Sequence, residues 1–316
     1  MAAPKLRGRA GPSARWDCII VGGGPAGLSA AIYMGRFRRR TLVVDAGDGR
    51  WSYGQVNQNY LGFPRGVGAQ RLHRLGRAQA ERFGVSFRAG TVTGLVPTAG
   101  GYLLREGGRT LRARTVVWAT GVKDHWPDFA GARRLVGQRL FWCLICDGWR
   151  TWRRQVLVLG NDDGAARTAL QFLTYTRRLT LLVDPERARL SGLSQRKLAE
   201  QGVALLRGRV KSVRAPRGER LSVRLEDGRR LRPSYVFSLL GHTARTAELR
   251  HLDLALTRRG HVRVDEDGRT RLPALFAAGD VTDKHTHQVV SAAHEGAVAA
   301  QAANQVLYPP AQKLPK

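Results

Sequence analysis

Residues 17–27 read Asp17-Cys18-Ile19-Ile20-Val21-Gly22-Gly23-Gly24-Pro25-Ala26-Gly27, an apolar run that ends in a glycine-rich turn. Small and apolar residues follow from Leu28 to Met34, so the pattern predicts a strand, a tight turn and a helix. Gly22 permits the turn, Gly24 lets a diphosphate approach the backbone, and Gly27 lets helix and strand pack closely. Free N–H groups in the first turn of the helix would then hold the phosphates of a dinucleotide.

The next apolar run supplies the acid that such a site requires. Thr41 to Val44 predicts a second strand, and it ends in Asp45, 18 residues after Gly27. A carboxylate at this position can accept hydrogen bonds from ribose hydroxyls. Two later runs, Thr115 to Gly121 and Leu275 to Val281, also predict buried strands that lead into tight turns.

The composition fits a globular protein of two domains. The chain has 316 residues, 43% of them hydrophobic, and no apolar stretch approaches the roughly 20 residues that a membrane span requires. Residues 1–14 are basic and contain Pro and Gly, without the apolar segment of a signal peptide. We expect a disordered basic tail on a cytoplasmic protein that has no membrane partner.

The net charge of +29 comes mostly from arginine, because only seven of the 53 basic residues are lysines. Long-range attraction could recruit a partner with a negative surface, such as an acidic electron-transfer protein or nucleic acid. The arginine runs, among them residues 36–40 and 177–178, are scattered, and the sequence has no recognisable nucleic-acid-binding motif. We therefore expect no nucleic-acid partner. An acidic protein partner and an arginine preference without any partner both stay open.

Two of the three cysteines stand in Cys143-Leu144-Ile145-Cys146, and Asp147 follows directly. A two-residue spacer brings both sulfurs within disulfide range, and one thiol can be stabilised as the thiolate that attacks disulfides. Asp147 can carry the proton that this exchange requires. Half of a zinc site and two buried thiols are the alternatives, but Cys18 lies in an apolar run and no close histidine pair follows Cys146. The motif therefore predicts a redox dithiol and no metal site.

Several stretches, in this order along the chain, resemble the thioredoxin reductase family of FAD-dependent disulfide oxidoreductases, of the low-molecular-weight type. The resemblance covers about residues 16–308. Besides the glycine turn, it rests on Asn59 to Pro64, Ala119 to Gly121, Cys143 to Gly148, Leu240 to His242, Ala278 to Asp280 and His287 to Gly296.

The resemblance implies FAD as the cofactor and assigns parts of the chain to it. The diphosphate would lie at the turn that contains Gly22, Gly24, Pro25, Ala26 and Gly27, and the adenosine ribose would meet Asp45. The flavin half would be held by residues distributed along the rest of the chain: Asn59, Ala119, Thr120, Gly121, Gly279, Asp280, Gln288 and Val289. His287 replaces the Arg that is usual in the family, and it would cap the edge of the flavin or simply lie at the surface.

For the dithiol, the resemblance implies that Cys146 exchanges electrons with the flavin and that Cys143 reacts with the outside substrate. Asp147 would be the general acid and base of that reaction. A helix-capping role for Asp147 is compatible with this chemistry.

A second strand, turn and helix pattern follows the dithiol, but its turn differs. Residues 160–164 read Gly160-Asn161-Asp162-Asp163-Gly164, where the family has a glycine-rich turn for NADPH. Asp162 adds a Cβ and a negative charge, and repulsion of a diphosphate a few ångströms away costs on the order of several kcal/mol. Asp184 and Glu186 stand where the family has cations for the 2′-phosphate. We therefore expect NADPH to be a doubtful ligand.

Two interpretations would still allow this second site to bind a nicotinamide dinucleotide. Asp184 is placed to bind a ribose 2′-hydroxyl, which would suit NADH, and Arg187 or Arg189 could reach back toward a phosphate. We favour a vestigial or repurposed nicotinamide-type domain.

The predicted fold is α/β with two Rossmann-like three-layer domains. The FAD domain would be discontinuous, residues 15–122 and 249–316, with an inserted nicotinamide-type domain at 123–248 that carries the dithiol. In the insert, residues 210–214, 221–225 and 231–234 predict a small antiparallel meander. The resemblance also implies a homodimer.

We expect an FAD-dependent thiol-disulfide oxidoreductase whose electrons enter in one of three ways. A ferredoxin-type protein could reduce the flavin, which reduces the dithiol and then a thioredoxin-like disulfide. Small dithiols could instead reduce the cysteine pair, with oxygen as the final acceptor. A conventional NAD(P)H-dependent thioredoxin reductase is the third possibility, and a non-catalytic flavin-holding partner protein is an alternative of another class.

Overall fold

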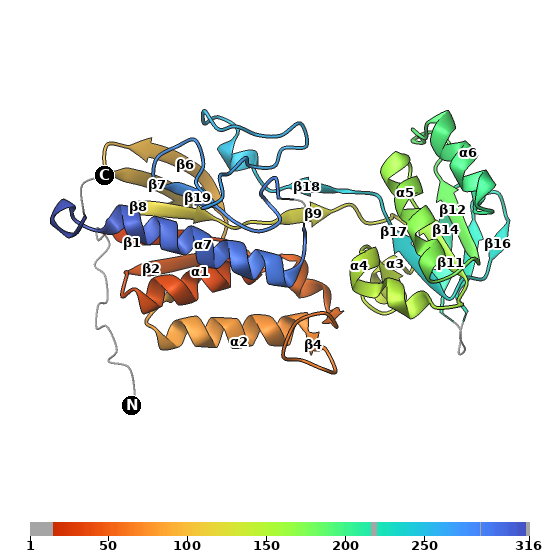
Figure 1. Cartoon of the computed structure of the whole chain (residues 1–316), viewed down its shortest axis with the longest axis horizontal. Helices are drawn as coiled ribbons and strands as arrows, with labels where there is room; N and C mark the ends of the chain where they lie inside the picture. The colour runs from red at the N-terminus through yellow and green to blue at the C-terminus, as the bar shows by residue number, and fades with distance from the viewer. Residues whose placement is uncertain (1–14, 216–219, 285, 314–316) are drawn as a thin grey trace. The chain divides into compact units, whose positions relative to one another are not determined.

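The computed structural model describes residues 15–215, 220–284 and 286–313, so the tail expected at residues 1–14 lies outside the described residues. The chain divides into two compact units. The first contains the chain up to Ser52, Tyr60–Lys123 and the residues from Thr243 onward, and the second contains Tyr53–Asn59 and Asp124–His242. Each unit has its own parallel sheet covered by helices, which confirms the predicted α/β class (Figure 1).

The first unit is built on a seven-stranded sheet in the order β5-β2-β1-β8-β7-β6, and β19 pairs with the end of β8. The strands of this sheet are β1 Trp16–Val21, β2 Thr41–Asp45, β5 Ser86–Ala89, β6 Val92–Thr98, β7 Gly101–Glu106, β8 Arg109–Trp118 and β19 Leu275–Ala277. β1, β2, β5 and β19 pair in parallel, whereas β6, β7 and the start of β8 form an antiparallel meander.

Three helices of the first unit are α1 Pro25–Arg36, α2 Ala69–Arg82 and α7 Val289–Leu307. α1 and α7 lie side by side under the sheet in Figure 1, and small residues allow that approach. A Cβ at Gly296 of α7 would lie 2.0 Å from the backbone oxygen of Ala26 in α1. The alanines of α7 and the apolar residues of β1 therefore share one core.

The register of the parallel strands brings their carboxyl ends to one edge of the sheet. Val21 at the end of β1 pairs with Val44 of β2 and Trp118 of β8, and Trp118 also pairs with Ala277 of β19. The segments that follow these four strands therefore begin at the same edge. In open α/β sheets, ligands bind at this edge.

The second unit has a five-stranded sheet in the order β10-β17-β11-β12-β13. Its elements are β10 Leu140–Phe141, β11 Val156–Leu159, β12 Leu179–Val183, β13 Ala204–Arg207 and β17 Tyr235–Ser238, with helices α5 Asp163–Gln171 and α6 Gly192–Glu200. The predicted meander is present as β14 Val210–Arg214, β15 Ser222–Leu225 and β16 Arg230–Leu231.

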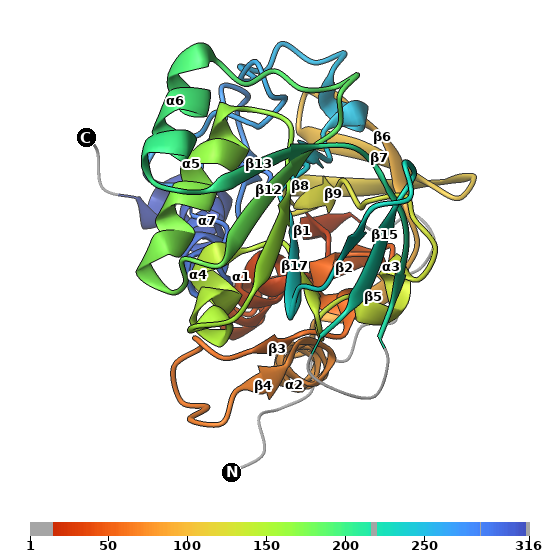
Figure 2. The same cartoon turned by 90° about the vertical axis from the view of Figure 1, so that its right-hand side faces the viewer.

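Alternation along β11 explains the layers of this unit. Val156 and Val158 belong to the core beneath α5 and α6, whereas Leu157 and Leu159 belong to the core shared with β14 and β15. Figure 2 shows the two helices on one face of the sheet and the meander on the other.

The remaining elements are short. They are β3 Val56–Asn57, β4 Val67–Gly68, β9 Val122–Asp124, β18 His242–Ala244, α3 Ala132–Leu135, α4 Leu144–Asp147, and the 3-10 helices η1 Arg50–Tyr53, η2 Gly148–Thr151, η3 Phe172–Thr174, η4 Ala247–Leu249 and η5 Pro310–Gln312. Within the described ranges, no helix combines the length and the apolar character needed to cross a membrane.

Candidate dinucleotide site and dithiol

The turn between β1 and α1 has the geometry that an anion site requires. Gly22 has φ +105°, and a Cβ there would lie 2.3 Å from the backbone oxygen of Ala119. A Cβ at Gly27 would lie 1.9 Å from the oxygen of Gly22, so neither glycine can be replaced without movement. Gly24 is the N-cap of α1, makes no side-chain capping bond, and has open space where its Cβ would be. With Pro25 opening the helix, the first turn is left uncapped by side chains, which suits a phosphate.

Asp45 ends β2 beside this turn, and its carboxylate is held in the ionised form. Burial alone would raise the pKa of Asp45, but hydrogen bonds from His73 and from the backbone N–H groups of Gly23 and Gly47 outweigh burial and lower it. The Nε2 atom of His73, on α2, lies 3.7 Å from Oδ2 of Asp45. An ionised, largely buried carboxylate is suited to accept hydrogen bonds from hydroxyl groups.

The segments after β8 and β19 are fixed by internal hydrogen bonds. The Thr120 hydroxyl donates to the backbone oxygen of Arg245 at 2.8 Å, and the next residue, Gly121, has φ +65°. Gly279 has φ +81°, and its N–H donates to Oε2 of Glu295 at 2.8 Å. Burial raises the pKa of Glu295, although the bonds from Gly279 and Thr282 oppose this. Glu295 therefore fixes the turn that presents Asp280.

Asp280 itself is paired with an arginine that follows β2. Nη1 of Arg50, in η1, lies 2.7 Å from Oδ2 of Asp280, and both side chains are mostly buried. The two acids expected at the ends of the dinucleotide, Asp45 and Asp280, thus both belong to the first unit, and each has a basic side chain as its neighbour.

The remaining residues expected at the flavin are placed differently. Gln288 is the N-cap of α7 and forms a capping box with Ser291, and Val289 is the first residue of that helix. His287 directly precedes them and is partly buried. Asn59 is exposed and ends the segment 53–59, which groups with the second unit. The structure gives Gln288 a capping role that the sequence analysis did not foresee.

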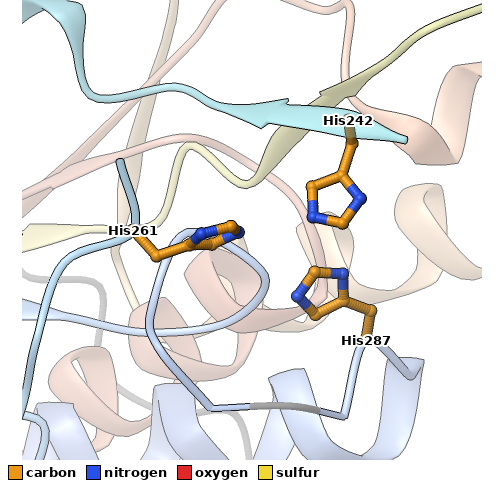
Figure 3. A group of neighbouring side chains, drawn as sticks. All are labelled: His242, His261 and His287. Atoms are coloured by element: carbon orange, nitrogen blue, oxygen red, sulfur yellow. The ribbon is translucent and has the colours of Figure 1, made fainter. Parts of the chain in front are cut away.

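Figure 3 shows three histidines that are far apart in the sequence, His242, His261 and His287. One ligand atom from each lies within 4.8 Å of the others, and this is the one such group of potential metal ligands in the described part of the chain. Burial lowers the pKa of His261, and the neighbouring charge of His287 lowers it further. Because His287 adjoins Gln288 and Val289, this histidine group is adjacent to the residues expected at the flavin.

In the second unit, Cys143 and Cys146 are joined as a disulfide, with their Cα atoms 5.3 Å apart. Cys143 is the N-cap of α4, and its Sγ accepts a hydrogen bond from the backbone N–H of Cys146 at 3.1 Å. Cys18 is completely buried in β1 of the other unit, where burial raises the pKa of its thiol to about 12. Cys18 is therefore a core residue and takes no part in the pair.

Asp147 lies at the end of α4, and its side chain is only 14% exposed. Burial raises the pKa of this carboxyl, while a 2.8 Å hydrogen bond from Nε of Arg150 opposes the rise. A carboxyl group with a raised pKa can hold a proton nearer to neutral pH, as a general acid must.

The turn between β11 and α5 has a side-chain cap, whereas the turn between β1 and α1 has none. Asp162 is the N-cap of α5, and its Oδ1 accepts the N–H of Ala165 at 2.9 Å. The side-chain oxygen of Asn161 accepts the N–H of Asp184 at 2.9 Å, and the carboxylate of Asp163 accepts the N–H of Ser191 at 2.8 Å. Asp162 therefore satisfies one of the N–H donors in the first turn of α5 that a bound diphosphate would use, and the other two bonds tie the loop after β12 to this turn.

The charges beyond β12 are partly balanced. Arg187 lies 3.8 Å from Asp184, with a side chain that is 79% exposed, and Arg209 lies 3.0 Å from Glu186. Arg189 donates to the backbone oxygen of Ala188. The two arginines considered as phosphate ligands, Arg187 and Arg189, thus have contacts within their own loop.

Sequence reasoning did not single out Arg50, His73, Glu295 or Arg150. Three of these four residues contact a predicted acid, and Glu295 contacts Gly279. Only Arg150 carried a usable signal, because it lies three residues after Asp147 in a helical segment.

Comparison with known proteins supports this geometry. Residues 16–297 match the family described as pyridine nucleotide-disulphide oxidoreductase. A thioredoxin reductase of Treponema pallidum is 30% identical over 298 residues, 91% of this chain and 96% of the relative. A thioredoxin reductase of Listeria monocytogenes is 28% identical over 300 residues, 92% of this chain and 93% of the relative.

Among solved structures, the crystal structure of HlmI superposes with a TM-score of 0.82 at 30% sequence identity and covers 92% of both chains. The chain therefore belongs to the pyridine nucleotide-disulphide oxidoreductase family and is a flavin-dependent disulfide oxidoreductase of the low-molecular-weight, thioredoxin reductase-like type.

Proposed function

We propose that the Cys143-Cys146 pair exchanges electrons between FAD and an outside disulfide or dithiol, without NADPH as the usual donor. The outside substrate is a thioredoxin-like protein or a small dithiol or disulfide, since the Listeria and Treponema relatives are named thioredoxin reductases. The working protein is a cytoplasmic homodimer, as the resemblance to the family and the cysteine content favour.

The first unit has groups suited to two parts of FAD, a helix N-terminus for the diphosphate and two acids for the hydroxyl groups. The N-terminus of α1 has no side-chain cap, and the space beside Gly24 is open to an approaching phosphate. Asp45 and Asp280 are the acceptors for the hydroxyl groups of FAD, and Gly279 keeps the backbone close to it. Bound FAD supplies a carrier that accepts and donates electron pairs in exchange with the dithiol.

Thiol-disulfide exchange then follows from the residues of the second unit. The Cys143 thiolate attacks one sulfur of the substrate disulfide, and the other substrate sulfur leaves and takes a proton from Asp147. Cys146 gives its proton to Asp147 and attacks the Cys143 sulfur, which releases the second substrate sulfur to take that proton. Two electrons pass to the substrate, and the Cys143-Cys146 disulfide forms. The N–H of Cys146, which donates to Cys143 Sγ, favours the attacking thiolate.

The observation that carries the choice of electron donor is the contrast between the two helix N-termini. The N-cap residue of α1 is Gly24, which has no side chain to accept a hydrogen bond from the helix. The N-cap residue of α5 is Asp162, whose carboxylate accepts such a bond. A diphosphate at α5 would have to displace that carboxylate and would meet its negative charge. We therefore place the electron source in a ferredoxin-type acidic protein, which the net charge of +29 would attract, or in a dithiol with oxygen as the final acceptor.

A conventional NAD(P)H-dependent reductase is the second candidate. It is favoured by Arg187, whose mostly exposed side chain could exchange its contact with Asp184 for a phosphate.

The dithiol mechanism is tested with a Cys146→Ser variant. Reduction of the flavin by dithiothreitol, followed anaerobically as bleaching of the yellow colour, should slow at least about 1,000-fold, because the pair can no longer form its disulfide. Cys18→Ala is the matched control and should bleach like the wild type. Normal bleaching of Cys146→Ser would exclude the pair as the route to the flavin.

A further inference from the structure

The three histidines of Figure 3 form a group that the dithiol chemistry does not use. His242 is the first residue of β18 and is bonded directly to Thr243, where the chain returns to the first unit. His261 and His287 lie within that unit. One ligand nitrogen from each ring lies within 4.8 Å of the others, and the nitrogens are turned toward the space between the rings.

The backbone at two of these histidines is held by hydrogen bonds of its own turn. The N–H of His261 donates to the hydroxyl of Thr257 at 3.1 Å, and its backbone oxygen accepts the N–H of Thr257 at 2.8 Å. His287 lies between Thr286 and Gln288, and the N–H of Gln288 donates to the oxygen of Thr286 at 3.0 Å. The rings of His261 and His287 have centroids 6.0 Å apart. Two of the three imidazoles are therefore presented by preformed turns.

Burial and charge around the group decide what could bind there. His261 is only 8% exposed, whereas the other two rings are partly exposed, which leaves a route from solvent. Asp280 and Asp283 favour positive charge beside His261, and Arg259 opposes it. Because Asp280 is also paired with Arg50, these charges nearly cancel. The affinity of the group for a ligand must therefore come from its nitrogen donors.

Three imidazole nitrogens are a donor set typical of Zn²⁺ and related transition metals, whereas Mg²⁺ and Ca²⁺ prefer oxygen ligands. Zn²⁺ bound by three histidines keeps its fourth tetrahedral position for water. Nitrogens that share a tetrahedral Zn²⁺ lie about 3.3 Å apart, so the widest separation in the group would have to shorten by about 1.5 Å at most. Rotation about the side-chain bonds of the two partly exposed histidines can provide this movement.

We propose that His242, His261 and His287 form a binding site for Zn²⁺, separate from the dithiol and from the diphosphate turn. The three rings supply neutral nitrogen donors, and water completes the coordination. His287 directly precedes Gln288 and Val289, so the ion lies close in the chain to residues expected at the flavin. Binding of Zn²⁺ here goes beyond the proposed function and does not depend on the source of the electrons.

The test is titration of the full-length, tag-free flavoprotein with Zn²⁺ by isothermal titration calorimetry. The protein is kept oxidised, because the Cys143-Cys146 disulfide then cannot bind the metal. The wild type should bind a single Zn²⁺ per chain with a dissociation constant in the micromolar range or below. His287→Gln should raise this constant at least about 100-fold, since groups that only orient a metal ligand are already worth about 10- to 100-fold.

His294→Gln is the matched control, because His294 is an exposed histidine of α7 outside the group, and it should bind Zn²⁺ like the wild type. His242→Gln repeats the test from a second segment, in case His287→Gln lowers the stability, which urea unfolding measures. Absence of Zn²⁺ binding by the wild type would overturn the site. Equal affinity of the wild type and both ligand variants would also overturn it, and so would an equal loss in His294→Gln, which would indicate binding by scattered surface histidines.

Discussion

At the scale of single residues, the chemistry of the second unit depends on how Asp147 holds its proton. Burial raises the pKa of its carboxyl, and the guanidinium of Arg150, 2.8 Å away, opposes that rise. Arg150 also lies over the rings of Trp149 and Phe141, so its position is fixed from several sides. Arg150 therefore sets how far the pKa of Asp147 rises above the usual value of a carboxyl.

An Arg150→Met variant should raise the pKa of Asp147 further, because burial would then act without an opposing charge. In the proposed mechanism Asp147 acts as a protonated acid in disulfide reduction, so activity should fall as pH rises through the pKa of Asp147. The descending limb of kcat/KM against pH should therefore move to higher pH in Arg150→Met than in the wild type. The measurement is the pH profile for reduction of a disulfide substrate, with the anaerobic protein reduced beforehand.

Two variants control for this experiment. Arg150→Lys keeps the charge and should leave the limb near its wild-type position. Arg153→Met removes a charge whose guanidinium lies over Trp152 and should not move the limb. A profile that is the same in wild type and Arg150→Met would show that Asp147 does not provide the titrating acid.

Among the elements, the two strand, turn and helix units differ in how the N-terminus of the helix is capped. The glycine turn before α1 leaves donors free, and the turn before α5 uses Asp162 to satisfy one of them. The loop from Asp184 to Ser191 is bonded to Asn161 and Asp163 and so adds to the closure. In the proposed function, the second strand, turn and helix unit therefore serves as a support for the dithiol.

The capping role of Asp162 predicts a difference between two variants. Asp162→Ala should lower the free energy of unfolding by about 1 kcal/mol, because the N–H of Ala165 loses its acceptor. Asp162→Asn keeps an acceptor oxygen and should cost only a few tenths of that. Urea unfolding followed by circular dichroism measures both. Arg167→Ala, at an exposed position of the same helix, is the control, and equal stability of Asp162→Ala and wild type would contradict the cap.

Much of this arrangement was predictable, because it depends on local pattern. Short apolar runs predict the strands that begin at Trp16, Thr41, Val156 and Leu179. The glycines between strand and helix indicate the tight turns. For the turn before α5, the sequence predicts the negative charge of Asp162 but not its capping bond. The hydrogen bond from the N–H of Ala165 depends on the side-chain rotamer of Asp162.

Contacts between distant segments could not be read from the sequence. Trp51 and His73 come from η1 and α2, and the three histidines of Figure 3 come from segments separated by many residues. Such contacts depend on how loops pack, which no periodicity encodes. The Gln288 capping box could not be predicted either, because it depends on the side-chain rotamers of Gln288 and Ser291.

At the scale of the whole molecule, each of the two units has its own core and its own half of the proposed chemistry. The first unit contains the proposed FAD site at the uncapped N-terminus of α1. The second unit contains the dithiol and the N-terminus of α5, which Asp162 caps. The net charge of +29 belongs to the chain as a whole and favours an acidic protein as the electron donor. The proposed function therefore differs from that of a conventional NAD(P)H-dependent reductase in the source of its electrons.

Anaerobic reduction of the purified yellow protein, followed through the absorption of the flavin, distinguishes the possible electron sources. Micromolar NADPH or NADH should leave the flavin oxidised, while reduced ferredoxin or dithiothreitol should bleach it. Rapid bleaching by micromolar NADPH or NADH would exclude the proposed electron source, because it would show that the turn at Asp162 admits a nicotinamide dinucleotide.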